Sequence, residues 1–218
     1  MFGYLLNIII TIKERLPFIW NVFEFINGKL FYYNNRMIYK SLYYYFDFFN
    51  SKSKFKIKLI TISDIRSLML LIDRLELNQK TFFEPHAFSY RSIKSLIYNK
   101  SFIMVGIFDD SKLIGYSFLR CFLNHKCFIG RLVDKDYRRQ GIGNIMNEIL
   151  YNTAWKSGFR IFATISKNNN LVMNAHKNNP YMKRLKDLKE DYLLVEFVKP
   201  QNKIIKKHFL NMHSFICY

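Results

Sequence analysis

The chain has 218 residues, of which 50% are hydrophobic, and it carries a formal net charge of +18 at pH 7. This hydrophobic content supplies a sizeable core and excludes a disordered chain, and the length fits one α/β domain with an additional segment. The charge suits an anionic partner such as CoA, a sugar nucleotide, a membrane surface or nucleic acid, and it does not choose among them.

Residues 1–54 combine aromatic and aliphatic side chains with scattered cations. The first apolar run, residues 1–12, is shorter than the roughly 20 residues that a spanning helix needs, and it lacks the features of a cleaved signal peptide. After Pro17 apolar residues recur at helical spacing, and an aromatic cluster at 43–49 precedes a linker-like stretch at 51–54. Three interpretations of this segment stay open: a surface that contacts the membrane interface, a pair of helices packed on the main domain or on a second subunit, or a disordered segment.

From residue 55 the hydrophobic pattern becomes that of a compact α/β domain, which we expect to extend to residue 200 and to be followed by a basic tail at 201–218. A strand is predicted over 55–62, a helix from Ser63, a loop at 82–86, a helix over 92–98, and a hairpin of strands 102–108 and 113–122. There follow a strand over 126–133, a glycine loop, a helix to about Lys156, a strand over 160–165, a helix over 168–177 and a strand over 192–198.

The most informative segment runs from Leu132 to Asn144, where a strand-like run ends, a charged turn follows, and Gly141 and Gly143 open an amphipathic helical pattern. Without a Cβ at these two positions, backbone N–H groups can approach a phosphate, and the helix N-terminus adds a partial positive charge. A Walker loop is excluded because no Gly-Lys-Ser/Thr follows, and the third glycine of a dinucleotide fingerprint is missing. The segment therefore predicts a site for a phosphate group.

Arg138, Gly141 and Gly143 follow the order Arg-x-x-Gly-x-Gly between a strand and a helix, and this resembles the acyl-CoA-binding signature of the GNAT acetyltransferases. The resemblance covers about residues 55–200. It implies an α/β fold of the GNAT type, a central mixed and mostly antiparallel sheet that is flanked by helices and splayed at the acyl-CoA site. It also implies acetyl-CoA as the acyl donor and no metal. The contacts implied for acetyl-CoA are Leu132, Val133, Arg138, Arg139, Gln140, Gly141, Ile142, Gly143, Asn144 and Asn169.

The same resemblance implies a proton donor for the departing CoA thiolate. The family usually has a tyrosine seven residues after an asparagine early in the next helix, and counting from Asn169 this position is His176. This is a departure from the family pattern, although an imidazole can donate a proton near neutral pH. Tyr181 could replace the missing hydroxyl if its loop folds back.

A base for the acceptor amine is the second catalytic role. His86 is the candidate, because it lies in the loop region that generally shapes the acceptor pocket in this fold, and a structural role for this histidine stays open. The strand position that bears glutamate in some relatives falls near Cys127. Asp134 and Asp136, close to the phosphate site, are interpreted as solvated turn residues.

Cysteine and histidine content does not indicate a metal centre. Cys121, Cys127 and Cys217 have no C-x-x-C spacing, and the five histidines are scattered along the chain. The three thiols are interpreted as reduced, which fits a cytoplasmic protein.

The leading hypothesis is an N-acetyltransferase that moves an acetyl group from acetyl-CoA to a primary amine. The basic, aromatic N-terminal segment suits work at the inner face of the membrane, for example on an amino sugar destined for a cell-surface polymer, and its extra aromatic surface is compatible with a homodimer. The alternative is a catalytically weak GNAT-like module that binds CoA or an anionic membrane surface, which the missing tyrosine and acidic base favour. Nucleic acid is not expected, because no RNA-recognition or helix-turn-helix pattern is present.

Overall fold

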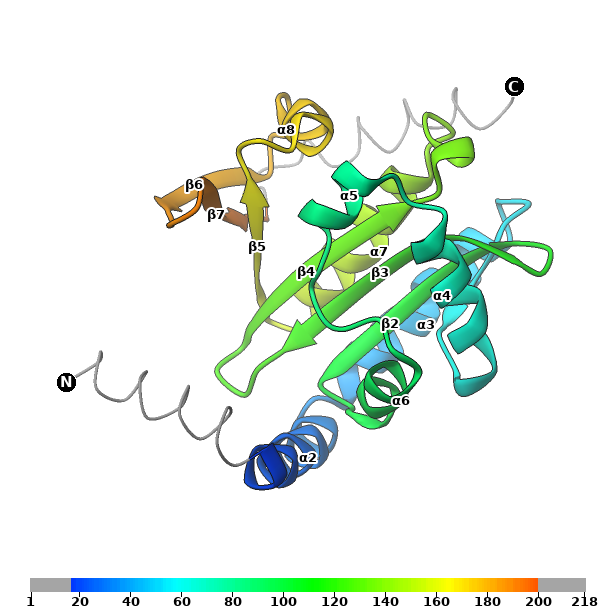
Figure 1. The fold of residues 1–218 in the computed structure, drawn as a ribbon. Helices are drawn as coiled ribbons and strands as arrows, with labels where there is room; N and C mark the ends of the chain where they lie inside the picture. The colour runs from blue at the N-terminus through cyan, green and yellow to red at the C-terminus, as the bar shows by residue number, and fades with distance from the viewer. Residues whose placement is uncertain (1–16, 200–218) are drawn as a thin grey trace.

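Seven strands form one sheet within residues 17–199, the part of the chain that the computed structural model describes (Figure 1). The strand order is β1-β2-β3-β4-β5-β7-β6, and each neighbouring pair is antiparallel except β4 and β5, which are parallel. The strands are β1 (Lys56–Leu59), β2 (Phe102–Asp109), β3 (Lys112–Cys121), β4 (Lys126–Val133), β5 (Arg160–Ser166), β6 (Met182–Asp187) and β7 (Tyr192–Phe197). The predicted fold class is confirmed. Expectations for the first apolar run and for the basic tail lie outside the described residues.

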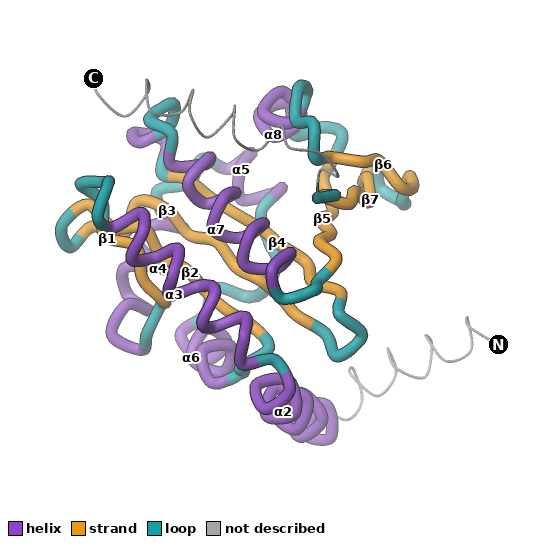
Figure 2. Tube along the Cα trace, turned by 180° about the vertical axis from the view of Figure 1, so that it is seen from behind, coloured by secondary structure: helices purple, strands orange, loops and turns teal. Residues whose placement is uncertain are grey.

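Helices cover both faces of this sheet (Figures 1 and 2). They are α2 (Pro17–Asn34), α3 (Arg36–Asn50), α4 (Ile65–Asp73), α5 (Leu77–Phe82), α6 (Tyr90–Tyr98), α7 (Ile142–Lys156) and α8 (Asn170–His176), with short 3-10 turns η1 (Ile62–Asp64) and η2 (Lys135–Tyr137). Buried residues of α3 and α7 form one core cluster on one face, and those of α4 and α6 form a second cluster on the other face. The sheet is therefore the middle layer of three.

Helix α7 fixes the position of the glycine loop, residues 134–143, whose last two residues are the first two of the helix. Its apolar residues Ile142, Met146, Ile149 and Leu150 recur at the i, i+4, i+7 and i+8 spacing of one helix face, and all four are buried against the sheet. Because Ile142, the first helical residue, is already buried, the N-terminus of α7 is packed against the sheet. It lies near the end of β4 (Figure 2).

Strands β4 and β5 pair over only three positions, residues 126–128 with 160–162, and then diverge (Figure 1). The second halves of both strands consequently have no parallel partner on that side. The splay that the family resemblance implies is present at this point of the sheet.

The N-terminal segment contributes to the core. Five side chains of α3 are buried in the cluster that also contains α7, namely Ile38, Leu42, Tyr45, Phe46 and Phe49. Asn50 at the end of α3 exchanges hydrogen bonds of 2.7 and 3.0 Å with the backbone of Ile57, which ties the helix to β1. Packing on the main domain, one of the interpretations of this segment, therefore holds for the inner face of α3. No helix among the described residues is long and apolar enough to cross a membrane.

Two elements were not expected from the sequence. Helix α5 precedes the loop at 82–86, and strand β6 pairs with β7 at the sheet edge. The β6 residues are mostly charged and exposed, as is common for a strand at the edge of a sheet. The sequence of β6 therefore has no alternation of apolar and polar residues by which a strand could be predicted.

Candidate active site

The glycine loop is open where an anion would approach. Gly141, the N-cap of α7, has a φ of 78°, in the left-handed region that favours glycine. A Cβ built on Gly141 or on Gly143 meets no heavy atom of the described residues within 4 Å. Because the first N–H groups of a helix lack intrahelical partners, this open space faces main-chain donors and the positive end of the helix dipole.

Asp134 anchors the loop from inside. Its side chain is only 1% exposed, and its carboxylate accepts hydrogen bonds from Arg74 Nε at 2.9 Å and from the Asp136 backbone N–H at 3.2 Å. Lys112 Nζ lies 3.6 Å away. The interpretation of Asp134 as a solvated turn residue is wrong, because two cations distant in sequence converge on it. Its charge is compensated, so it does not oppose an anion bound at the loop.

The remaining residues around the loop differ in whether their side chains are buried or exposed. Ile142 is buried in the core, so only its backbone can face a ligand. Arg139, which has a φ of 61°, Gln140 and Asn144 are exposed, and Arg138 is half-buried. Gln140 donates from Nε2 to the Asp136 carbonyl at 3.3 Å, a contact that closes the turn.

The register of β4 decides which backbone groups face β5. Asp134 donates its N–H to the Ile114 carbonyl of the β3 side at 2.8 Å. Since backbone direction alternates along a strand, Leu132 also points its N–H and carbonyl at β3, where its partner is Tyr116. Arg131 and Val133 point theirs toward the splay. Of the two residues that the resemblance assigns to the pantetheine arm, Val133 has the required orientation and Leu132 does not.

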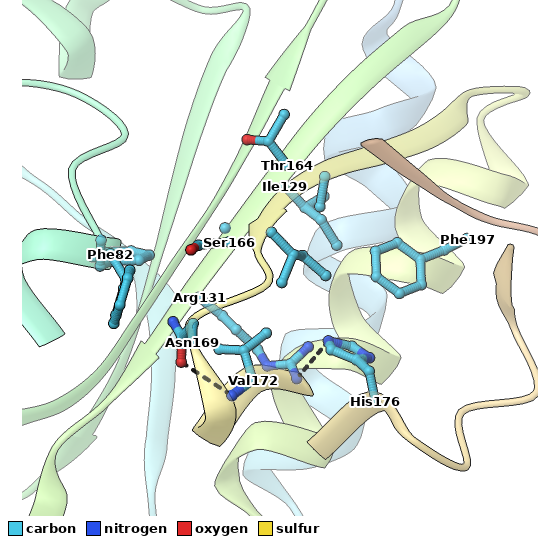
Figure 3. Close-up of a pocket in the computed structure, with 13 residues that line it drawn as sticks. Phe82, Ile129, Arg131, Thr164, Ser166, Asn169, Val172, His176 and Phe197 are labelled. Carbon is cyan, nitrogen blue, oxygen red and sulfur yellow. Dashed lines mark hydrogen bonds between the residues drawn. The ribbon is translucent and has the colours of Figure 1, made fainter. Parts of the chain in front are cut away.

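A cleft of about 120 Å³ occupies the splay between β4 and β5 (Figure 3). Both strands, α8, the end of α5 and β7 contribute to its lining. The residues are Phe82, Phe83, Ile129, Gly130, Arg131, Ala163, Thr164, Ile165, Ser166, Asn169, Val172, His176 and Phe197. The cleft is thus mostly apolar, and its polar lining residues are Arg131, Thr164, Ser166, Asn169 and His176.

Asn169 and His176 both lie in this cleft, at opposite ends of α8. Asn169 caps the helix, accepting the Val172 N–H on its Oδ1 at 3.2 Å, and within residues 17–199 its Nδ2 makes no hydrogen bond. His176 is buried, and its Nε2 lies 3.2 Å from Arg131 Nη2 (Figure 3). Because arginine can only donate, Nε2 is the acceptor in this contact.

His176 is neutral at neutral pH. Burial, together with the nearby Arg131 cation, lowers its pKa to about 4. Its Nδ1 lies 2.9 Å from the Asn179 side-chain nitrogen, so both ring nitrogens have neighbours. Near pH 7 His176 is therefore not an imidazolium, and it cannot act as a cationic proton donor. Tyr181 packs on Tyr151 and Trp155 of α7 and does not line the cleft.

His86 lies on the other face of the sheet, away from His176. Its Nε2 is 2.8 Å from the Tyr116 hydroxyl, and its ring contacts Phe88, Phe102 and Phe118. Burial lowers the pKa of this histidine. The structure therefore separates the two predicted catalytic histidines by the sheet.

The described cysteines and acidic residues form no second centre. Cys121 and Cys127 pair across β3 and β4 as buried free thiols, and burial raises the pKa of Cys121. Within residues 17–199 no group of three or more His, Cys, Asp or Glu side chains could hold a metal ion.

The model of the acetyltransferase (GNAT) family matches residues 70–179, a range that contains the glycine loop and nearly all of the cleft. The chain belongs to the GNAT family. The predicted membership is confirmed by this match and by the fold. No curated protein matches the chain.

Solved GNAT structures share the fold. PaiA N-acetyltransferase from Thermoplasma acidophilum in complex with coenzyme A has a TM-score of 0.56 at 18% identity, covering 66% of this chain and 99% of that chain. The ribosomal-protein-S5-alanine acetyltransferase from Vibrio fischeri has a TM-score of 0.56 at 16% identity, covering 69% of this chain and 96% of that chain. A spermidine N-acetyltransferase SpeG chimera from Vibrio cholerae and hSSAT has a TM-score of 0.54 at 13% identity, covering 73% and 99%.

Within this GNAT domain, sequence reasoning missed Arg131 and the two phenylalanines of the cleft, Phe82 and Phe83. A signal for Arg131 was present, because it is the one charged residue between Cys127 and Val133 in an otherwise apolar strand. Its contact with His176, 45 positions later, could not be read from the sequence.

Proposed function

We propose that this GNAT protein is an N-acetyltransferase that uses acetyl-CoA as its acyl donor and a primary amine as its acceptor. The observation that carries the proposal is the cleft at the β4–β5 splay, joined through β4 to an open glycine loop at the start of α7. One strand thus connects a place for a diphosphate to a place for a thioester.

The diphosphate would bind main-chain amides of the loop around Gly141 and Gly143, with Arg138 and Arg139 supplying positive charge. The pantetheine arm would lie along the unpaired side of β4, where Val133 and Arg131 direct their backbone groups. A backbone N–H on this side can stabilise the developing oxyanion when the amine nitrogen attacks the thioester carbon. Positioning of the two substrates would supply much of the remaining acceleration.

Isothermal titration with acetyl-CoA and with CoA tests the donor site. Binding is expected for the wild type, and the substitutions Gly141→Glu and Gly143→Glu should abolish it, because a carboxylate would occupy the open space of the loop. If the wild type fails to bind either compound at millimolar concentration, the proposal is wrong.

The acceptor is tested with a panel of amines in a thiol-release assay. The amino sugar predicted from the N-terminal segment is compared with spermidine and with peptides that begin with alanine, because two structural neighbours are named after these acceptor types. Turnover of nucleotide-linked amino sugars would support the prediction, and exclusive turnover of peptides would refute it.

A second candidate function is CoA binding without efficient transfer. It is favoured by the neutral, engaged His176 and by the cleft lining, which has no carboxylate among the described residues. Tight CoA binding without acetyl transfer to any amine of the panel would favour this function, and turnover would exclude it.

We also propose that α2 contacts an anionic membrane surface. Phe18, Phe25 and Ile26 are exposed on this helix, and Lys29 lies 4.8 Å from the Phe25 ring. An exposed apolar stripe beside cations is typical of an interfacial helix. Co-sedimentation with vesicles of anionic lipid, but not of neutral lipid, is the expected result. A concentration-dependent dimer that binds neither vesicle would assign this surface to a second copy instead.

A further inference from the structure

Arg131 is an unusual residue to find in this cleft. It is the one permanently charged side chain among the described residues that line it, and it is half-buried between apolar walls. Its side chain points along the cleft toward His176 of α8 (Figure 3). A cation in mostly apolar surroundings is expected to have a counter-charge or a specific task.

Neutral groups hold the guanidinium in place. Nη1 donates to Asn147 Oδ1 on α7, and Nη2 donates to His176 Nε2 on α8 at 3.2 Å. Among residues 17–199, no Asp or Glu forms an ion pair with Arg131. Tyr151, on the same side, offers no counter-charge, since burial raises its pKa to about 12. Asn147 and His176 therefore orient the cation without neutralising it.

The proposed reaction generates an anion in this cleft. When the amine nitrogen bonds to the thioester carbon, the carbon–sulfur bond breaks, its electron pair stays on sulfur, and the amine proton passes to solvent. The product is a CoA thiolate. His176 cannot act as an imidazolium near pH 7, so the thiolate needs another form of stabilisation.

We propose that Arg131 is a catalytic residue that stabilises the CoA thiolate as an ion, with His176 as the residue that positions its guanidinium. This inference rests on the proposed function, since it requires CoA to lie in the cleft. In this proposal the fixed positive charge of Arg131 stabilises the thiolate, so no proton has to be donated to sulfur. A neutral His176 can still position the guanidinium by accepting its hydrogen bond.

The test is the pKa of the thiol in bound CoA. The protein–CoA complex is titrated with base while the ultraviolet absorbance of the thiolate is followed, and the complex with desulfo-CoA is subtracted as the ligand control. A free thiol has a pKa of about 8.5, and a cation within about 4–6 Å should lower it by about one unit or more. Arg131→Met should bring the thiol pKa back to its free value, whereas Arg131→Lys should keep part of the effect.

Arg184→Met is the matched control, because it removes one positive charge from an exposed arginine of β6 and should leave the thiol pKa unchanged. A wild-type complex whose thiol titrates like free CoA would overturn the role of Arg131, as would equal thiol pKa values in wild type and Arg131→Met. If Arg131→Met does not fold, the comparison of wild type with Arg131→Lys decides. Absence of CoA binding would instead remove the proposed function, and this inference with it.

Discussion

Substitution of Gly143 by alanine separates what the glycine loop needs for folding from what it needs for binding. Gly143 is the second residue of α7, it has no positive φ, and a Cβ there meets no described atom within 4 Å. Alanine should therefore stabilise the free protein by about 0.4–1 kcal/mol, since it lowers the conformational entropy of the unfolded chain and favours helix. For a chain of this size that corresponds to an increase in Tm of about 1–4 °C.

The same methyl group lies where the diphosphate is proposed to approach the backbone. Affinity for CoA should fall at least about tenfold, which is about 1.4 kcal/mol. Gly141→Ala is the matched comparison, because its φ of 78° makes alanine cost about 1–2 kcal/mol of stability before any ligand is added. Stability and affinity should thus move in opposite directions at Gly143 and in the same direction at Gly141.

Thermal unfolding of the free proteins and isothermal titration with CoA measure the two quantities on the same samples. A Gly143→Ala protein that is stabilised and binds CoA with wild-type affinity would refute the placement of the diphosphate. A loss of stability at Gly143 that matches the loss at Gly141 would refute the reasoning about backbone geometry.

Three further predictions concern stability. Burial lowers the pKa of His176 to about 4 from about 6.5 in the unfolded chain, so the unfolded state binds the extra proton between these values, and stability is lost as the pH falls. In urea unfolding the wild type should lose about 2 kcal/mol more than His176→Gln between about pH 7.5 and about pH 5, and equal losses would contradict the burial of a neutral imidazole. Leu42→Ala, at a fully buried α3 position, should cost about 2–5 kcal/mol, whereas Met37→Ala, 62% exposed, should change stability by less than about 0.5 kcal/mol. Asp134→Asn should cost about 1–3 kcal/mol and weaken CoA binding, because Arg74 loses its counter-charge; a stable variant with normal affinity would show that the anchor is dispensable.

The glycine loop could be predicted because its signal is local. A strand, a turn, two glycines and a helix follow one another within about a dozen residues, and each has a backbone reason to be there. The contacts that complete the site are not local. Arg74 reaches Asp134 across 60 positions, and Arg131 reaches His176 across 45. From the sequence Asp134 is interpreted as solvated, because it is charged. Only the fold shows that it is buried and that Arg74 forms an ion pair with it.

The N-terminal segment shows a different limit of sequence reasoning. Hydrophobic periodicity states which face of a helix is apolar, but it does not state what covers that face. In α3 the apolar face is covered by the sheet and by α7, so Leu42 and Phe46 belong to the core. In α2 a similar composition leaves Phe18 and Phe25 exposed. One pattern therefore serves two environments in adjacent helices. The interpretation as a packed helix holds for α3, and a membrane surface at the exposed residues of α2 stays a proposal.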